Sequence, residues 1–278
     1  EKNINLQGLL AFSELGYLPQ THPFINKIIA VQAGEKVLFK ENKIFKEFYW
    51  SYPLKTNSYS QEVSPEKLRN ILQDSVDLHC QSDVPLGVFL SGGIDSNVVA
   101  GLAKRSKENL ISLSVGFSDG PKKLNELEVA RECSKFHGTT HYEFILSDKD
   151  VVNSLDKIVD HMDLPSFDGI NTFIVSEMAK KAGLKVALSG LGGDELFGGY
   201  GIYNFYPKFC NFLPIWLALP IYFKKALIHS LSLTLNKHRR IKIKKFKDIK
   251  DENDLYFAIR SNNPFNLRDT FSGNFNEL

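Results

Sequence analysis

Short apolar runs alternate with amphipathic segments through the middle of the chain. Runs rich in Val, Ile and Leu predict strands at residues 86–90, 110–116, 141–146 and 185–189. The segments beside them predict helices at residues 95–107, 125–137, 149–161 and 171–182. This alternation predicts an α/β fold in which a parallel sheet has helices on both faces.

Polar turns follow three of the predicted strands. Ligands bind beyond the carboxyl ends of parallel strands, so the turns after Leu90, Gly116 and Leu188 should share one rim. A loop expected to reach the same rim carries three further polar residues, Asp163, Asp168 and Asn171. Such residues suit either an acceptor site or helix caps.

The first 60 residues form a lead-in without a chemical motif. Residues 6–13 predict a short helix, and alternation over residues 35–39 and 44–50 predicts a β-hairpin. A polar linker is expected at residues 52–63. We therefore divide the chain into this lead-in over residues 1–60, an α/β domain over 61–200 and a helical extension over 201–278.

The α/β domain should begin with a helix. Ser64 suits its N-cap, Pro65 suits its first turn, and it should extend to about His79. Its predicted apolar face consists of Leu68, Ile71, Leu72, Val76 and Leu78.

The helical extension contains the most apolar run, at residues 209–223. It is shorter than the ~20 residues of a membrane span, and Pro214 and Pro220 interrupt it. We expect a buried helical hairpin there, with membrane contact as the alternative. The basic run at residues 237–247 suits either a solvated helix face or a site for a polyanion.

Composition and charge indicate an ordinary globular protein. The chain is 43% hydrophobic and 24% charged, and its net charge of +2 makes nucleic acid an unexpected partner. Its three scattered cysteines suit reduced thiols in a cytoplasmic protein. Four histidines lack metal-ligand spacing and are expected to be structural, His79, His137, His141 and His161. The chain begins at Glu1 without a signal peptide, so we expect a fragment of a longer polypeptide.

The first candidate for chemistry is the turn Ser91-Gly92-Gly93-Ile94-Asp95-Ser96, directly after an apolar strand. Adjacent glycines and a helix N-terminus offer N–H donors to an anion, which predicts a phosphate site. The lysine of a Walker loop is missing, because Gly93 stands in its place. Asp95 would repel a bare phosphate, so its expected role is to hold magnesium.

The second candidate is the segment from Ser189 to Tyr200, which also follows an apolar strand and contains five glycines. Asp194 is predicted as a second magnesium ligand that faces Asp95 across the rim. Glu195 is predicted only to complement the dipole of the helix that starts there.

These two motifs together resemble the synthetase domain of the asparagine synthetase family. The resemblance extends from about Leu6 to Tyr200 and is most specific at residues 189–200. It implies a PP-loop ATP pyrophosphatase fold of the adenine-nucleotide α-hydrolase type. It also implies an enzyme in which a substrate carboxylate attacks the α-phosphorus of ATP, and ammonia or an amine then displaces AMP to form an amide.

The resemblance implies a role for each matching position. Leu90 and Val115 would flank the adenosine with backbone groups. Pyrophosphate and magnesium would be bound by Ser91, Gly92, Gly93, Asp95 and Ser96. Ser189 and Gly190 would contact the nucleotide, and Asp194 the magnesium. The implied ligands are ATP and Mg²⁺, together with a small-molecule carboxylate and an ammonia or amine donor.

Three departures from the family's pattern affect the expected reaction. Leu191 stands where amide-forming members usually have an acidic residue, so aspartate is not the only plausible acceptor. A sugar uronic acid or a peptide closed into a lactam is the alternative. The family's glutaminase domain is missing from this chain, so we expect it as a further domain or subunit, or else ammonia or an amine arrives by another route. The lysine-containing segment that closes the pyrophosphate site is also missing, and Arg268 is a poor substitute.

Two other functions are alternatives to the amide-forming ligase. One is a nucleotide-binding module without turnover, which Leu191 and the missing segment favour. The other is a PP-loop enzyme that modifies tRNA, for which the basic run at residues 237–247 is the only support.

Overall fold

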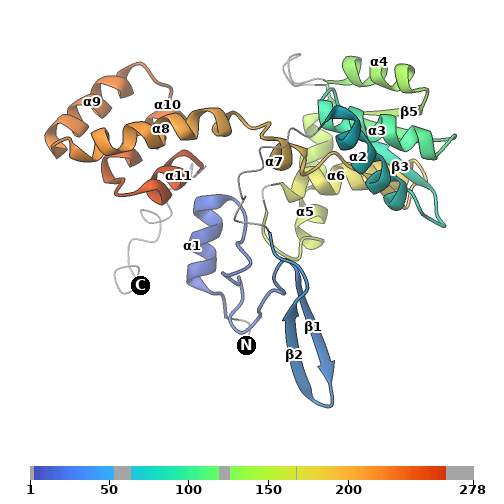
Figure 1. Ribbon diagram of the computed structural model, residues 1–278, viewed down its shortest axis with the longest axis horizontal. Helices are drawn as coiled ribbons and strands as arrows, with labels where there is room; N and C mark the ends of the chain where they lie inside the picture. The colour runs from blue at the N-terminus through green and yellow to red at the C-terminus, as the bar shows by residue number, and fades with distance from the viewer. Residues whose placement is uncertain (1–2, 53–63, 119–125, 167, 261–278) are drawn as a thin grey trace. The chain divides into compact units, whose positions relative to one another are not determined.

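The computed structural model describes residues 3–52, 64–118, 126–166 and 168–260, which Figure 1 colours by position along the chain. The chain separates into two compact units. The first consists of Lys55–Met162 and Asp168–Tyr200, and the second of Glu1–Leu54, Asp163–Phe167 and Gly201–Leu278. The linker predicted at residues 52–63 falls almost wholly outside the described residues.

The first unit contains a four-stranded parallel sheet. Its strands are β3 (Leu86–Phe89), β4 (Ile111–Phe117), β5 (Thr140–Leu146) and β6 (Val186–Leu188). They lie in the order β5-β4-β3-β6, and each neighbouring pair is parallel. The predicted parallel sheet is therefore confirmed, and no strand begins or ends more than one residue from its predicted position.

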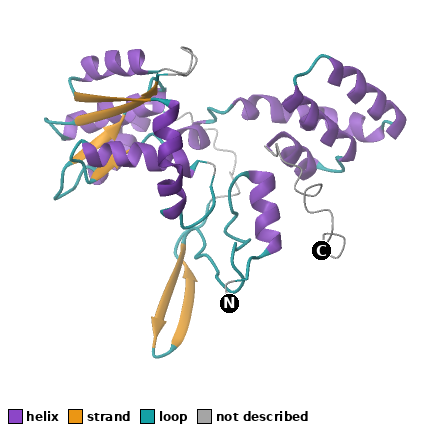
Figure 2. Ribbon diagram, turned by 180° about the vertical axis from the view of Figure 1, so that it is seen from behind, coloured by secondary structure: helices purple, strands orange, loops and turns teal. Residues whose placement is uncertain are grey.

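Helices cover both faces of this sheet, as Figure 2 shows with helices in purple around orange strands. They are α3 (Ile94–Ser106), α4 (Leu127–His137), α5 (Asp148–Asp160) and α6 (Gly169–Lys181). The connections through α3 and α4 step along the sheet in one direction, whereas the connection through α5 and α6 returns from β5 to β6. Right-handed crossovers then place α3 and α4 on one face and α5 and α6 on the other.

Two cores reflect this two-sided arrangement. Val88 and Leu90 pack with Ala100 and Ala103 of α3 in one cluster of buried residues. Leu113 packs in a separate cluster, with Ala179 of α6 and Leu184. Because successive side chains of a strand point to opposite faces, continuous apolar strands supply both cores.

Helix α2 (Pro65–His79) begins where predicted, since the Ser64 side chain accepts a hydrogen bond from the Lys67 N–H. The predicted apolar face was wrong in two positions, because Ile71 is 54% and Leu78 66% exposed. The helix packs mainly against α3. That contact is narrow, and it partly buries a stripe of residues four apart, Leu68, Leu72 and Val76.

The second unit contains the predicted lead-in elements. They are α1 (Leu6–Leu15), β1 (Glu35–Lys40) and β2 (Lys43–Phe48). The two strands form an antiparallel hairpin. Its turn residues Glu41 and Asn42 both have positive φ angles, of 52° and 58°, as a tight hairpin turn requires.

The C-terminal part of the second unit is mainly helical over its described residues 201–260, as predicted. Its elements are α8 (Gly201–Ala218), α9 (Ile221–Leu233), α10 (Lys237–Lys245), the 3-10 helix η2 (Phe246–Asp248) and α11 (Glu252–Arg260). Pro220 is the N-cap residue of α9, so residues 209–223 contain the turn of a helical hairpin, with the end of α8 before it and the first three residues of α9 after it. Within the described part of the chain, no helix combines the length and the apolarity that crossing a bilayer requires.

The hairpin departs from the prediction in two respects. Pro214 lies inside α8 and does not interrupt it, although proline removes a helical hydrogen bond. The adjacent Leu213 is buried against Leu255 and Ala258, and this packing offsets the local cost. The hairpin is also not buried, because large apolar side chains such as Phe223 remain more than half exposed.

The basic run lies on α10 and η2. The Arg240 guanidinium donates to the carbonyl oxygens of Leu235 at 2.7 Å and Leu233 at 3.3 Å. The Lys242 ammonium donates to the Ile259 carbonyl at 3.3 Å. Cations at carbonyl-rich helix ends are stabilising, so at least part of this run has a structural role.

Candidate active site

The first glycine-rich turn leaves β3 and enters α3. Leu90 is still tied to the sheet, because its N–H donates to the Leu113 carbonyl at 2.8 Å. The Ser91 N–H donates to Ser96 Oγ at 3.1 Å, and the Gly93 N–H donates to Ser91 Oγ at 3.1 Å. The two hydroxyls lie 2.9 Å apart. Both serines of the motif therefore shape the turn from within.

Gly92 has a different partner from its neighbours. Its N–H donates to Oε2 of Glu126 at 3.1 Å, across 34 positions of the chain. Glu126 is the residue before α4, and it was not predicted as a site residue. The only signal in the sequence was a carboxylate at a predicted helix start, which has an ordinary explanation in the helix dipole.

The second glycine-rich turn leaves β6 and enters the short helix α7 (Gly193–Phe197). Gly192 has a φ of 94°, a left-handed conformation that favours glycine. The Leu191 N–H donates to Ser189 Oγ at 3.2 Å, so a serine also orders the start of this turn. Leu191 itself is 87% exposed.

The two turns are in direct contact. A β-carbon on Gly190 would come within 2.7 Å of the Ser96 backbone nitrogen. One on Gly193 would come within 2.5 Å of Asp95 Oδ2. Real side chains do not approach so closely, so glycine at both positions is what lets the second turn lie against the first.

A cavity of about 420 Å³ opens between the two turns. Nine of the ten predicted site residues line it, namely Leu90, Ser91, Gly93, Asp95, Ser96, Val115, Ser189, Gly190 and Asp194. Gly92 is the exception, and it lines a neighbouring pocket instead. The predicted rim is therefore one continuous surface, and its volume is in the range of small-molecule sites.

The three polar residues of the loop that was expected to reach the rim lie in different places. Asn171 lines the cavity. Asp168 occupies the N-cap position of α6, but its side chain makes no capping hydrogen bond. Asp163 belongs to the second unit. Glu195 also lines the cavity, and its Oε1 accepts a hydrogen bond from the Tyr200 hydroxyl at 2.7 Å.

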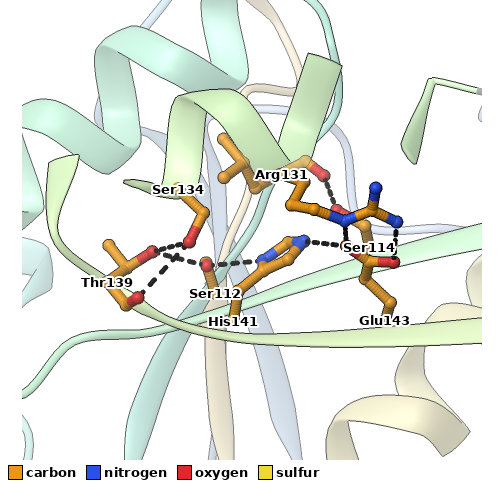
Figure 3. Close-up of polar contacts among 8 residues, drawn as sticks. Ser112, Ser114, Arg131, Ser134, Thr139, His141 and Glu143 are labelled. Carbon is orange, nitrogen blue, oxygen red and sulfur yellow. Dashed lines mark hydrogen bonds and ion pairs between the residues drawn. The ribbon is translucent and has the colours of Figure 1, made fainter. Parts of the chain in front are cut away.

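A polar cluster ties β4 and β5 to α4 beside the cavity (Figure 3). Ser112 Oγ lies 2.7 Å from Thr139 Oγ1 and 2.8 Å from His141 Nδ1. The Ser134 hydroxyl of α4 joins Thr139 Oγ1 at 2.8 Å. Ser114, which lines the cavity, donates to the Leu90 carbonyl. The cluster therefore joins the beginnings of β4 and β5 to α4, and of these residues Ser114 reaches the cavity.

The same cluster contains an ion pair and a histidine. Arg131 donates to both oxygens of Glu143 at 2.7 Å, which lowers the pKa of Glu143. His141 Nε2 lies 3.7 Å from Glu143 Oε1, too far for a hydrogen bond. Burial lowers the pKa of His141, although the nearby carboxylate acts in the opposite direction. The structural role predicted for His141 agrees with these contacts.

The donors of the cavity suit magnesium bound together with a polyphosphate. Asp95 and Asp194 both line the cavity and provide the oxygen atoms that magnesium prefers. Among the residues that the structure describes, no group of three or more His, Cys, Asp or Glu side chains is placed to hold a metal. Two carboxylates leave several coordination positions to phosphate oxygens and water, which is typical of magnesium.

Comparisons with known proteins identify the family of this chain. The sequence model of the family described as Asparagine synthase matches residues 67–265, more than half of the chain. The glutamine-hydrolysing asparagine synthetase 1 of Bacillus subtilis strain 168 is 33% identical over 204 residues, 72% of this chain and 32% of that protein. The glutamine-hydrolysing asparagine synthetase of Brassica oleracea is 32% identical over 170 residues, 56% of this chain and 28% of that protein.

The comparison with solved structures gives a weaker match. The NH3-dependent NAD synthetase of Campylobacter jejuni is 18% identical, with 70% of this chain and 97% of that chain covered and a TM-score of 0.34. The chain spans about a third of the length of the curated relatives named above. From the extent of the family match and the two glycine-rich turns, this chain belongs to the asparagine synthase family.

Proposed function

We propose that this chain is the synthetase part of an ATP-dependent carbon–nitrogen ligase that releases AMP and pyrophosphate. The observation that supports this most directly is the contact between the two glycine-rich turns around one cavity. The first turn lacks the Walker lysine, which fits binding of a departing pyrophosphate better than transfer of the γ-phosphate. The family of the chain also indicates an amide-forming ligase.

The first step joins the acceptor acid to AMP. An oxygen of the substrate carboxylate attacks the α-phosphorus of ATP, and the bond from that phosphorus to the bridging oxygen breaks. Pyrophosphate leaves with the electron pair of the broken bond and with several negative charges. N–H donors of the first turn and the start of α3 stabilise these charges more as they develop, and this lowers the barrier.

The chain's own residues orient the nucleotide in this scheme. Backbone groups of Leu90 and Val115 flank the adenosine, and Ser189 with Gly190 contacts the nucleotide from the second turn. Asp95 and Asp194 hold magnesium, which when bound neutralises phosphate charge. The hydroxyls of Ser91 and Ser96 keep the first turn in shape before the nucleotide arrives.

The second step forms the amide. Ammonia or an amine attacks the activated carbonyl carbon, loses a proton, and displaces AMP. The two relatives named above are glutamine-hydrolysing, so we propose that a glutaminase domain or subunit supplies ammonia to this chain as well. The unpaired thiols of Cys80, Cys133 and Cys210 suit work in the reducing cytoplasm.

The test is exchange of labelled pyrophosphate into ATP by the intact protein. Exchange that depends on an added carboxylate and on magnesium is expected, because adenylation is reversible. An intact, folded protein that neither binds ATP nor shows exchange with any of a panel of carboxylates would exclude the proposed function. Tight ATP binding without exchange would instead identify a nucleotide-binding module without turnover.

Leu191 favours a second candidate for the acceptor. Its exposed apolar side chain lines the cavity where an acidic residue is usual in the family. We therefore include uronic acids and amino-acid or peptide carboxylates beside aspartate in the panel. The acid that supports the fastest exchange identifies the acceptor.

A further inference from the structure

The N–H groups of Ser91, Gly92 and Gly93, at the start of the first turn, each have an acceptor within the chain. Ser91 and Gly93 donate to neutral hydroxyls of their own motif. Gly92 donates to the Glu126 carboxylate, which comes from outside the motif and is negatively charged. A carboxylate bonded to a glycine N–H in such a turn stands in for an oxygen of a phosphate.

We propose that Glu126 is an internal anion that occupies the phosphate-binding N–H of Gly92 until a nucleotide displaces it. This inference rests on the proposed function, because it assigns Glu126 to the same phosphate site. Glu126 is a positioning residue in this role: it holds the turn open in the absence of nucleotide and competes with phosphate for one donor.

The surroundings of Glu126 fix where its side chain can reach. The first turn of α4 lies directly against Gly92, since a β-carbon on Gly92 would be 3.2 Å from Val129 Cβ and 3.5 Å from Glu126 Cβ. Glu126 lines the nucleotide cavity and is exposed. An exposed side chain can rotate into water without leaving a buried charge behind, so the exchange of carboxylate for phosphate is reversible.

This exchange has a consequence for selectivity. A ligand must replace a charge-assisted hydrogen bond to reach Gly92, and the displaced carboxylate stays close to the new anion. A polyphosphate with bound magnesium tolerates the nearby Glu126 carboxylate, because the metal neutralises part of its charge. A singly charged anion gains too little binding free energy at Gly92 to displace that carboxylate. The return of Glu126 to Gly92 also favours the departure of pyrophosphate after the reaction.

The test compares Glu126→Gln with Glu128→Gln in the intact protein. Glu128 lies on the first turn of α4, two positions after Glu126, but does not line the cavity, so its substitution removes the same charge as a matched control. Binding of ATP and of inorganic pyrophosphate is measured calorimetrically with magnesium and without a carboxylate acceptor. Loss of the charge-assisted bond to Gly92 should tighten binding of both probes about five-fold in E126Q and leave E128Q unchanged.

The outcomes separate the inference from the proposed function. Equal or weaker binding by E126Q, with normal binding by the wild type, overturns the role of Glu126 and leaves the proposed function standing. Tightening of the same size in E128Q also overturns it, because the effect would then be general electrostatics. Absence of binding of either probe to the wild type overturns both. A merely structural Glu126 does not produce tighter binding, and matching thermal melts confirm that each variant is folded.

Discussion

The backbone of Gly193 lies against the carboxylate of Asp95, with no room for a side chain between them. A β-carbon at position 193 would come within 2.5 Å of Asp95 Oδ2 and 2.8 Å of Oδ1. This glycine therefore joins the two turns and fixes where the proposed magnesium ligand points. The glycine richness of residues 189–200 has a packing explanation as well as a conformational one.

Gly193→Ala should displace Asp95 and lower the rate of ATP–pyrophosphate exchange about 100-fold, the typical effect of a misplacement near 1 Å. Gly193 is only half-buried and lies at the end of a turn, so the melting temperature should change little. The matched control is Gly183→Ala. Gly183 has a φ of 79° and nothing within 4 Å of its would-be β-carbon, so G183A should cost stability through strain and leave exchange intact. An active G193A would show that the position of Asp95 does not matter.

Asp95→Asn and Asp194→Asn test the proposed magnesium ligands separately. Each substitution keeps the size of the side chain and removes the charge that attracts the metal. We expect each to lower exchange by about 10²–10³-fold and to raise the magnesium concentration needed for half-maximal rate. Thermal melts should stay close to the wild type. A variant with normal magnesium dependence would remove that residue from the proposed set.

Arg131 and Glu143 form a bidentate pair that ties α4 to β5 beside the site. The Arg131 side chain is half exposed, so solvent screening limits how much the ion pair stabilises the folded state. Arg131→Ala should lower the free energy of unfolding only slightly, measured by urea denaturation. Arg131→Lys should recover little of this, because an ammonium group cannot pair with both oxygens at once. Full recovery by lysine would indicate that the charge alone matters.

The pH dependence of stability should include a contribution from His141. Burial lowers the pKa of His141 below its ordinary value of 6.5, so the folded state takes up a proton less readily than the unfolded chain. Stability is then fully present above the ordinary value and falls as the pH decreases from there toward the lowered pKa. His137 has a pKa lowered by burial too, and adds a contribution of the same sign.

The measurement is the melting temperature between pH 8 and pH 5 for the wild type and His141→Asn. Asparagine can keep a hydrogen bond to Ser112 but does not titrate, so its curve should be flatter. Parallel curves for the two proteins would contradict the expected role of His141, because Glu143 and His137 would then account for the whole pH dependence.

The order of strands and helices was predictable because each element has a local signature. Strand Leu86–Phe89 is a continuous apolar run, and Ser64 with Pro65 marks a helix start. Both glycine-rich turns were found from the same kind of local pattern. Their mutual contact followed only as an expectation from the parallel sheet, which places the ends of β3 and β6 side by side.

What the sequence did not reveal depends on contacts between distant residues. Glu126 reaches Gly92 across 34 positions, and no periodicity marks such a pair. Pro214 lies within α8 because packing of Leu213 outweighs a local preference. Ile71 and Leu78 are exposed because α2 has a narrow contact with α3, and the width of a contact is not encoded in one helix.

Leu191 provides a test of the acceptor that separates binding from folding. Its side chain is 87% exposed, so Leu191→Ala should change the free energy of unfolding by less than about 0.5 kcal/mol. It lines the cavity beside Ser189 and Gly190, and a contact with the acceptor would be lost with the side chain. We expect the KM of the acceptor carboxylate in the exchange assay to rise several-fold while the KM of ATP stays constant.

Leu191→Glu restores the acidic residue usual in the family and should shift the preferred acceptor toward aspartate. Because a glutamate at an exposed position perturbs folding as little as alanine does, a change in acceptor preference in this variant reports on substrate contact. An unchanged preference and unchanged KM values in both variants would place the acceptor away from Leu191, and Asn171 would then be the next residue of the cavity to test.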